Sequence, residues 1–326
     1  MNEYLTQEIW KMREKITTLP GTPVVELIHV VAKTYQLLFL SRGCQWACTF
    51  CNYGLDYPLT LEMVLPELLK IRLEDYDIGE FELEANGSFL AEREIPYNLF
   101  LATLEFIANK NIPTITIETH YRDVTEKKIQ DIRRILGDNQ RICMELGFES
   151  ADKDVRDIYN KDIDLGEYFK VVKLCEKYNI GLEINVLLGA PFLTREEQIQ
   201  DCLDSLEFIF NKMPESTIAV IFPINIKENT MVKHWQDIGV YDQISLWELI
   251  ELLYRVPKDY LDKLTIAWWG MRENAFTYGI TQHPKTCEKC HQRLMDSLSD
   301  FYANWDKDFR RELIVNLWEN RCECDL

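Results

Sequence analysis

The chain has 326 residues, 47% of them hydrophobic, which is enough for one barrel-sized domain and a small appendage. Its net charge of −18 disfavours nucleic-acid binding by the chain alone, because such binding depends on neutralising phosphates. No apolar run approaches the length of a bilayer span, and no signal peptide is evident, so we expect a cytoplasmic protein without membrane contact. Ten cysteines in such a chain favour metal sites over disulfides.

The first strong signal in chain order is a cysteine-rich loop. Residues 37–41 predict a short buried strand, and Cys44, Cys48 and Cys51 follow within a few residues of its end. Three thiolates are one short of a closed four-cysteine shell, so a 4Fe–4S cluster held by them keeps one iron open to a ligand from outside the protein. The alternatives are a zinc site with a fourth ligand elsewhere, or three unrelated cysteines.

Helical and strand patterns then alternate along the chain. Apolar spacing predicts helices over 61–73, 99–108, 124–136, 167–178 and 196–210, and strands over 81–84, 114–118, 142–147, 182–188 and 217–222. Six strands interleaved with helices predict an α/β fold, a partial (β/α)6 TIM-like barrel with its active site at the carboxyl ends of the strands. We expect an N-terminal helical extension over 1–35, the core barrel over 36–225, and a C-terminal extension over 226–326.

Three strand ends carry further candidate site residues. Asn86, Gly87 and Ser88 follow the second strand, where their backbone carbonyls could accept from an ammonium, although an ordinary Asn-Gly turn has the same pattern. Glu149 ends the fourth strand, where a carboxylate can accept both hydroxyls of a ribose; the alternatives are a solvated carboxylate or a helix cap. Gly189 would let the backbone approach a ligand closely.

Two aromatic and charged runs are candidates for substrate contact. The first is Glu118, His120, Tyr121 and Arg122 at the end of the third strand. The second contains Trp269 and Arg272, after a predicted extra strand over 264–267, and core packing is its alternative. Three further cysteines lie on apolar faces, where we expect them to be buried and inert: Cys143, Cys175 and Cys202.

The C-terminal region contains a second cysteine pattern. Cys287 and Cys290 form a Cys-x2-Cys pair, and Cys322 and Cys324 form a Cys-x-Cys pair beyond a helical stretch over 292–318. Four thiolates make a closed shell, so we expect a structural metal site that holds either zinc or a second 4Fe–4S cluster. His283 and His291 flank the first pair as substitute ligands, and free thiols on an amphipathic tail are the alternative.

The spacing Cys44-x3-Cys48-x2-Cys51, with Phe50 before the last cysteine, resembles the signature of the radical S-adenosylmethionine (SAM) enzymes. This resemblance implies that the three cysteines hold a 4Fe–4S cluster whose open iron binds SAM, and that a reductant such as flavodoxin or ferredoxin supplies electrons. It places Phe50 and the backbone at Tyr53 against the adenine. It also implies that the turn at Asn86, Gly87 and Ser88 binds the SAM amino group, that Glu149 binds the ribose, and that Gly189 lies near the cofactor.

Several segments more closely resemble the archaeosine-synthase radical SAM subfamily, within the methylthiotransferase-like branch. They are Gly87-Ser88-Phe89-Leu90, residues 190–194, residues 245–249 and the cysteine-bearing tail. In that family a partner transferase supplies a lysine-modified base in tRNA, which the enzyme cleaves by radical chemistry. Because the chain is acidic, we instead expect a small polar or amino-acid-derived substrate, with the archaeosine-type tRNA lyase and a 3-amino-3-carboxypropyl transferase as alternatives.

Overall fold

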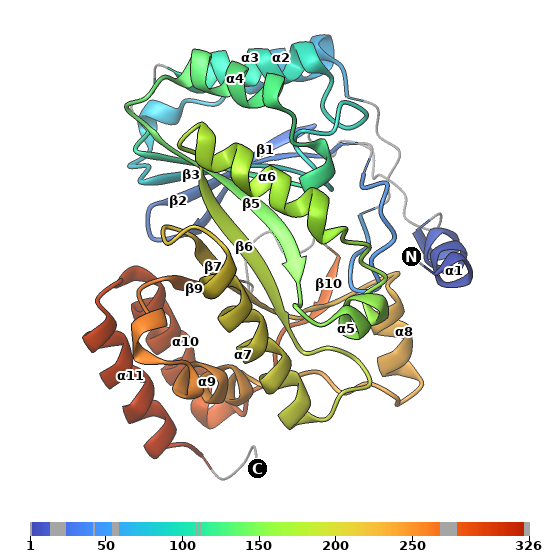
Figure 1. Cartoon of the computed structure of the whole chain (residues 1–326), viewed down its shortest axis with the longest axis vertical. Coiled ribbons are helices and arrows are strands. Elements are labelled where there is room, and N and C mark those ends of the chain that lie inside the picture. Colours follow the sequence, from blue (N-terminus) through green and yellow to red (C-terminus); the bar gives the residue numbers. More distant parts are fainter. Residues whose placement is uncertain are drawn as a thin grey trace.

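The computed structural model describes residues 2–13, 24–41, 43–53, 59–108, 110, 112–267 and 279–322. Its centre is one curved sheet with the strand order β1-β2-β3-β4-β5-β6-β7-β9 (Figure 1). The strands are β1 Val25–Val31, β2 Thr34–Phe39, β3 Glu80–Ala85, β4 Thr114–Thr119, β5 Arg141–Glu149, β6 Gly181–Leu188, β7 Ile218–Pro223 and β9 Leu264–Ile266. All neighbours from β2 to β9 pair in parallel, whereas β1 is antiparallel to β2.

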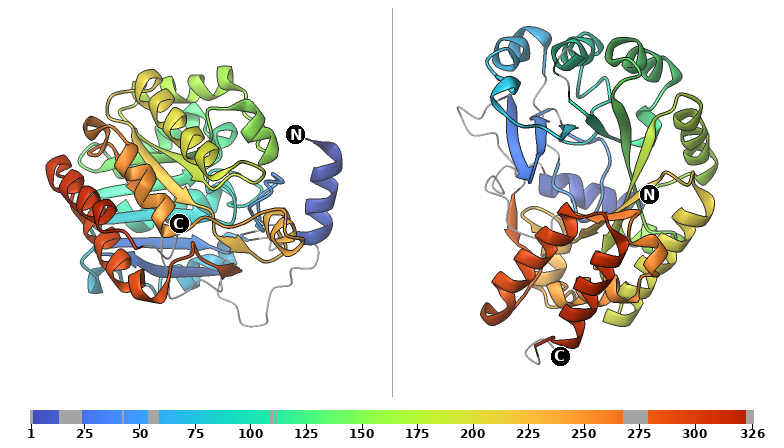
Figure 2. Two further views of the ribbon diagram at one scale, coloured as in Figure 1. Left: turned by 90° about the horizontal axis from the view of Figure 1, so that it is seen from below. Right: turned by 90° about the vertical axis from the view of Figure 1, so that its left-hand side faces the viewer.

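Helices lie outside the curved sheet, as expected for βαβ connections between parallel strands (Figures 1 and 2). Those that follow strands of the barrel are α2 Leu61–Leu68, α3 Tyr97–Ala108, α4 Glu126–Leu136, α5 Lys153–Ile158, α6 Leu165–Lys177 and α7 Arg195–Lys212. The others are α1 Glu3–Arg13, α8 Met231–Asp237, α9 Leu246–Arg255, α10 Glu288–Ala303 and α11 Lys307–Glu319. No helix in the described part of the chain combines the length and apolarity needed to cross a bilayer.

The predicted partial barrel is confirmed, and its six predicted parallel strands are joined by β9, the predicted extra strand. Local signals explain several boundaries: Thr194 and Glu197 form a capping box at the start of α7, and Thr125 caps α4. The main core lies between the sheet and its outer helices, and it includes Phe81, Ile117 and Leu146 from successive strands.

The N-terminal extension differs from its expected helical character. Only α1 is helical in the described part of residues 1–35, and β1 joins the sheet as an edge strand. The segment contains β-branched and apolar residues that suit a strand, and a turn at Ala32, whose φ is 49°, brings β1 back along β2. The C-terminal extension contributes the edge strand β9, which pairs with β7.

The C-terminal helices lie beside the open side of the sheet, where β1 and β9 do not pair. The Tyr302 hydroxyl at the end of α10 lies 3.2 Å from the Thr34 hydroxyl at the start of β2. A small sheet of β8 Ile226–Lys227 and β10 Ile280–Gln282 lies after β7. The α10–α11 hairpin therefore contacts the amino ends of the barrel strands (Figure 2).

Candidate functional site

A cavity of about 590 Å³ lies inside the curved sheet. We call the end near the carboxyl ends of the strands its upper end, and the end near their amino ends its lower end. Cys44, Cys48 and Cys51, on the loop that follows β2, line the upper end. Upper-end location is typical of active sites in α/β barrels.

The three cysteines are spaced more widely than the ligands of one tetrahedral metal ion. A single tetrahedral ion with metal–sulfur bonds of about 2.3 Å holds its sulfurs roughly 3.8 Å apart. Among the described residues, only the tail cysteines bring three candidate ligand atoms within 4.8 Å of one another, so Cys44, Cys48 and Cys51 spread more widely. Burial raises the pKa of the Cys48 thiol to about 11 and that of Cys44 well above its usual value, so both thiols hold their protons at neutral pH.

Arg13, at the end of α1, holds the cysteine loop from behind. Its guanidinium donates to the backbone carbonyls of Trp46 at 2.6 Å, Cys51 at 3.0 Å and Cys48 at 3.4 Å. Arg13 is 1% exposed. Its positive charge lowers the pKa of the Cys48 thiol, but burial raises that pKa by more. No sequence pattern singled out Arg13, because its role depends on where α1 packs.

The turn after α5 also holds the cysteine loop in place through hydrogen bonds. The Asn160 amide donates to the carbonyl of Ala47 at 2.8 Å, and the Thr49 amide donates to the carbonyl of Tyr159 at 3.0 Å. Asn160 has a φ of 54°, a left-handed conformation that asparagine tolerates better than most residues. The loop that carries the cysteines is therefore fixed by two distant segments.

Gly87 lies directly against the first cysteine. A Cβ at this position would come 2.4 Å from the Cys44 Cβ and 2.7 Å from a carboxyl oxygen of Glu94. The Ser41 hydroxyl donates to Glu94 at 2.8 Å, and burial raises the pKa of Glu94 to about 7. The absence of a side chain at Gly87 thus lets this turn approach the cysteine loop.

The two residues beside Gly87 support the turn and are not among those that line the cavity. The Asn86 side-chain amide donates to the Ser41 backbone carbonyl at 3.2 Å. The Ser88 hydroxyl donates to Asp123 at 2.7 Å, and the His120 amide donates to Ser88 at 3.0 Å. Their side chains therefore position the turn.

Glu149 and Lys161 form a buried ion pair near enough to Cys48 for both charges to act on its thiol. The Lys161 ammonium lies 2.7 Å from the Glu149 carboxylate, and their side chains are 11% and 7% exposed. Glu149 has a φ of 68° at an irregularity in the pairing of β5 with β6, a strained backbone that is typical of functional sites. A Cβ on Gly147 would lie 2.5 Å from Glu149 and 2.7 Å from Lys161, so glycine leaves room for the pair.

Aromatic side chains complete the upper end. Phe50 and Tyr53 line the cavity, and Phe50 packs edge-on against Tyr159 with ring centroids 5.5 Å apart. Trp46 stacks on His120 at 4.3 Å. Burial lowers the pKa of His120 to about 2, with Lys161 and Arg122 adding to the effect, so this imidazole is neutral.

The other strand-end candidates separate into two groups. Glu118 lines the cavity, whereas Tyr121 is buried in the core and Arg122 forms an ion pair with Asp162 at 3.2 Å. Gly189 is not among the lining residues. A Cβ there would come 2.9 Å from Ile244, and the Tyr241 hydroxyl donates to the Gly189 carbonyl at 3.0 Å, so this glycine serves packing within the protein.

The tail cysteines converge in space. Cys287 and Cys290, at the start of α10, lie with Cys322, beyond α11, so that their sulfurs are within 4.8 Å of one another. The group contains neither His283 nor His291. Cys322 is disulfide-bonded in the structure, so it ligates a metal only after reduction. This spacing suits one tetrahedral ion.

Three predicted residues lie outside the described part of the chain: Trp269, Arg272 and Cys324. The remaining cysteines are buried in the core, as expected: Cys143, Cys175 and Cys202.

Comparisons with known proteins agree with this arrangement. Residues 38–206, just over half of the chain, match the model of the radical SAM superfamily. The chain is 26% identical to archaeosine synthase subunit beta of Methanosarcina acetivorans over 91% of this chain and 89% of that protein. It is also 26% identical to the uncharacterized protein MJ0550 of Methanocaldococcus jannaschii, over 90% of this chain and 80% of the relative.

Among solved structures, methylornithine synthase superposes with a TM-score of 0.53 at 14% identity, covering 92% of this chain and 91% of that one. This likeness concerns the fold alone. The predicted resemblance to the archaeosine-synthase subfamily is confirmed as a similarity that spans most of the sequence. With its cysteine loop at the carboxyl ends of a partial barrel, the chain belongs to the radical SAM superfamily of enzymes.

Proposed function

We propose that this enzyme binds a 4Fe–4S cluster through Cys44, Cys48 and Cys51, cleaves SAM reductively, and performs radical chemistry on a small polar or amino-acid-derived substrate. The observation that carries the proposal is the common cavity: its upper end is lined by the three cysteines, and the Glu149–Lys161 pair lines the same cavity. Family membership implies the cluster and SAM as cofactors.

The residues around the cysteines fit these cofactors. Cys48 is buried, Cys44 and Cys51 are half-buried, and the three thiols are spaced more widely than the ligands of one ion. Gly87 allows the close approach that a side chain would block. Phe50 and Tyr53 would contact the adenine, Glu149 the ribose, and the Gly87 backbone the amino group of SAM. When bound and reduced, the cluster supplies the electron that breaks a carbon–sulfur bond of SAM. The chain's own contribution is to orient SAM and exclude water.

A tRNA-modifying activity is the second candidate. The similarity to a protein named as a subunit of archaeosine synthase favours it and favours a partner protein. The charge of −18 favours the small substrate, since an acidic surface repels phosphates. Gel retardation of tRNA by the purified chain at moderate salt would support the tRNA candidate.

We further propose that the tail cysteines, once Cys322 is reduced, hold one structural metal ion, zinc rather than a second cluster. Their sulfurs are within 4.8 Å of one another, which a single ion requires and a cluster with each cysteine on a different iron does not. Cys324 would be the fourth ligand. Bound metal would join the start of α10 to the end of α11.

The first experiment reconstitutes the protein anaerobically with iron and sulfide, reduces it with dithionite or flavodoxin, adds SAM and identifies the fragments by mass spectrometry. 5′-Deoxyadenosine is expected, whereas methylthioadenosine would indicate a 3-amino-3-carboxypropyl transferase. Cys48→Ala should abolish cleavage and keep the far-ultraviolet spectrum, and Cys175→Ala, which removes a buried core cysteine instead, should retain cleavage. Full cleavage by Cys48→Ala would refute the cluster assignment.

A further inference from the structure

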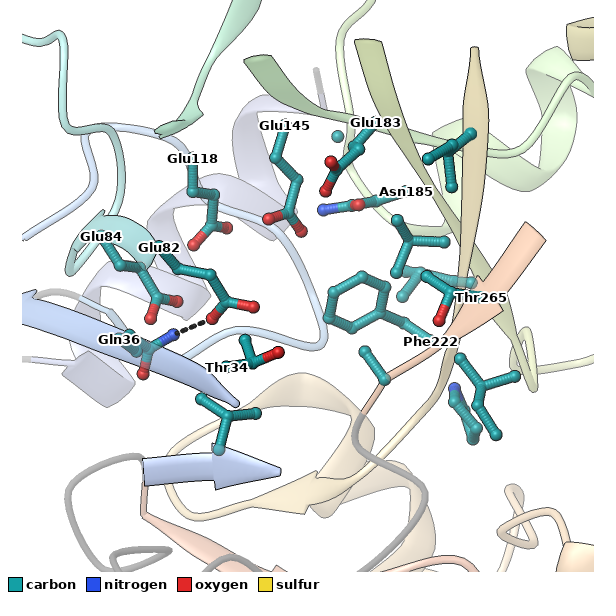
Figure 3. Close-up of a pocket in the computed structure, with 18 of the residues that line it drawn as sticks. Thr34, Gln36, Glu82, Glu84, Glu118, Glu145, Glu183, Asn185, Phe222 and Thr265 are labelled. Atoms are coloured by element: carbon teal, nitrogen blue, oxygen red, sulfur yellow. Dashed lines mark hydrogen bonds between the residues drawn. The ribbon is translucent and has the colours of Figure 1, made fainter. Parts of the chain in front are cut away.

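The cavity wall formed by β6 and β7 carries an amide group among apolar side chains. The apolar members of this wall include Leu187 on β6 and Val220 and Phe222 on β7. Asn185 on β6 lies among them and points into the cavity between Glu183 and Phe222 (Figure 3). This wall therefore combines apolar contact area with one group that can form hydrogen bonds.

The carbonyl oxygen of Asn185 is buried without a hydrogen-bond partner. The residue is 7% exposed, and no donor in the described part of the chain reaches this oxygen. The Thr265 hydroxyl on β9 lines the same cavity and likewise lacks a partner among the residues that the structure describes. Most buried polar side-chain atoms in proteins have a partner, so an acceptor left without one on a cavity wall indicates a donor from a bound molecule.

The strand neighbours of Asn185 carry no charge. Asn185 pairs with Gly147 on β5 and with Val220 on β7. The carboxyl groups of Glu145 and Glu183 lie two residues earlier on β5 and β6, and burial raises the pKa of Glu183 to about 8, so that it is protonated at neutral pH. An ion at the level of Asn185 would lose its hydration without a charged neighbour on either adjacent strand. A neutral polar group is therefore the better fit.

The chemistry of an asparagine side chain narrows the kind of group that fits. It presents an acceptor oxygen beside a donor nitrogen. A carboxamide presents the same two groups in the reverse order, so two amides can join through a pair of hydrogen bonds. An ammonium would satisfy only the oxygen of Asn185, and a carboxylate only its nitrogen. The apolar side chains around Asn185 suit a hydrocarbon chain that carries the amide.

Asn185 lies next to the place proposed for SAM. Its neighbour Gly147 precedes Glu149, the proposed ribose ligand, by two residues, which is about 7 Å along a strand. Leu187, two residues beyond Asn185, pairs with Phe222. A hydrocarbon chain that runs from the amide over Leu187 and Phe222 would therefore lie beside SAM.

We propose that the substrate carries a carboxamide on an aliphatic chain, and that Asn185 binds this amide while Leu187, Val220 and Phe222 contact the chain. Its assignment as substrate rests on the proposed radical SAM function. Binding of the amide requires no cleavage of SAM, so it can be measured separately in the unreduced enzyme.

Isothermal titration calorimetry of the reconstituted enzyme, with SAM present, no reductant and no oxygen, tests the proposal. The probes are hexanamide, hexanoate and hexylamine, which share one hydrocarbon chain and differ in the polar group. We expect hexanamide to bind at least tenfold more tightly than either ion, because only the amide matches both groups of Asn185. Equal binding of the three probes by the wild-type enzyme would overturn the proposal without any variant.

Two substitutions at Asn185 test the residue itself. Asn185→Leu keeps the volume and removes both hydrogen-bonding groups, so it should weaken hexanamide binding roughly tenfold or more. Asn185→Asp replaces the donor nitrogen with an acceptor, so it should favour hexylamine over hexanamide. Asn211→Leu, the same change on the exposed surface of α7, should leave all three affinities unchanged. Hexanamide binding that survives in Asn185→Leu would refute the role of Asn185.

Urea unfolding separates a binding role from a structural one. Because the Asn185 oxygen has no partner in the substrate-free protein, Asn185→Leu should leave the unfolding midpoint unchanged or raise it. A lower midpoint would indicate a structural asparagine and contradict the proposal. SAM cleavage by the reduced enzyme distinguishes the remaining failures. Intact cleavage without hexanamide binding refutes only the substrate class, whereas hexanamide binding without cleavage refutes the proposed radical SAM function.

Discussion

At the residue scale, the cysteine loop depends on contacts that lie outside its own sequence. Arg13 satisfies three backbone carbonyls of the loop and brings a buried positive charge next to Cys48. Gly87 matters because it has no side chain: a Cβ at this position would collide with the Cβ of Cys44. Both features lead to predictions that can be checked on single variants.

Arg13→Ala should impair cluster assembly and lower stability by roughly 3 kcal/mol, because it leaves buried carbonyls without donors. It should also make the cluster harder to reduce, since a nearby positive charge favours the electron. Redox titration followed by electron paramagnetic resonance, and urea unfolding, measure the two effects. Arg13→Lys keeps the positive charge, but its single ammonium cannot reach all three carbonyls. The cluster's reduction potential should therefore stay close to that of the wild type, whereas the free energy of unfolding should still fall. An unchanged potential in Arg13→Ala would contradict the electrostatic role.

Gly87→Ala should reduce the iron content severalfold, because its Cβ would displace Cys44; overpacking of this kind costs about 1–3 kcal/mol. Iron and sulfide analysis after reconstitution measures the loss. Gly166→Ala is the matched control, since that glycine begins α6 with only the Asp164 carboxylate nearby. Equal iron in both variants would show that the Gly87 turn can move away from the cysteine.

At the element scale, the α10–α11 hairpin connects the tail cysteines to the cavity inside the sheet. Cys287 and Cys290 begin α10, and Met295 and Tyr302 of the same helix line the cavity. Arg310 of α11 is fully buried and donates to the carbonyls of Phe301, at 3.0 Å, and Leu264, at 2.7 Å. The hairpin is therefore anchored to β9 at one end and held by the cysteines at the other.

Cys290→Ala should release one zinc per chain and loosen this hairpin, while SAM cleavage without substrate is kept, because α10 follows the tail cysteines and contacts the start of β2, at the end of the strand remote from Cys44. Metal analysis by mass spectrometry and hydrogen exchange over residues 288–319 test this. Cys202→Ala, in the core, should keep the zinc. Iron in place of zinc, with the absorbance of a second cluster, would contradict the single-ion assignment.

At the scale of the whole molecule, buried carboxyl groups make stability depend on pH. Burial raises the pKa of Asp201 to about 6, and burial together with Glu80 and Glu145 raises that of Glu183 to about 8. The folded protein binds these protons more tightly than the unfolded chain, in which carboxyl pKa values are near 4. The stabilisation that these two protonated carboxyl groups give to the folded protein is fully present below about pH 4. It is lost as the pH rises through their pKa values in the folded state.

The substrate-free protein should therefore unfold at a lower urea concentration at pH 8 than at pH 6. Glu183→Gln should flatten this dependence, because the neutral amide loses nothing on deprotonation, and Glu176→Gln, exposed on α6, should not. Urea unfolding of wild type and both variants at the two pH values decides the matter. Equal midpoints for the wild type would mean that these carboxyl groups are already ionised or hydrated at pH 6.

Local patterns in the sequence determined the family and most of the elements. Cysteine spacing, apolar periodicity and capping residues such as Thr194 are patterns within a few consecutive residues. They can therefore be recognised in the sequence without a structure. Only tertiary structure decided the rest. Glu80, Glu82 and Glu84 alternate with apolar residues, a pattern that a solvent-facing strand would share, and the barrel's curvature turns them into a cavity. Arg13 reaches the cysteine loop, and Cys322 reaches Cys287, only because packing joins residues far apart in the chain.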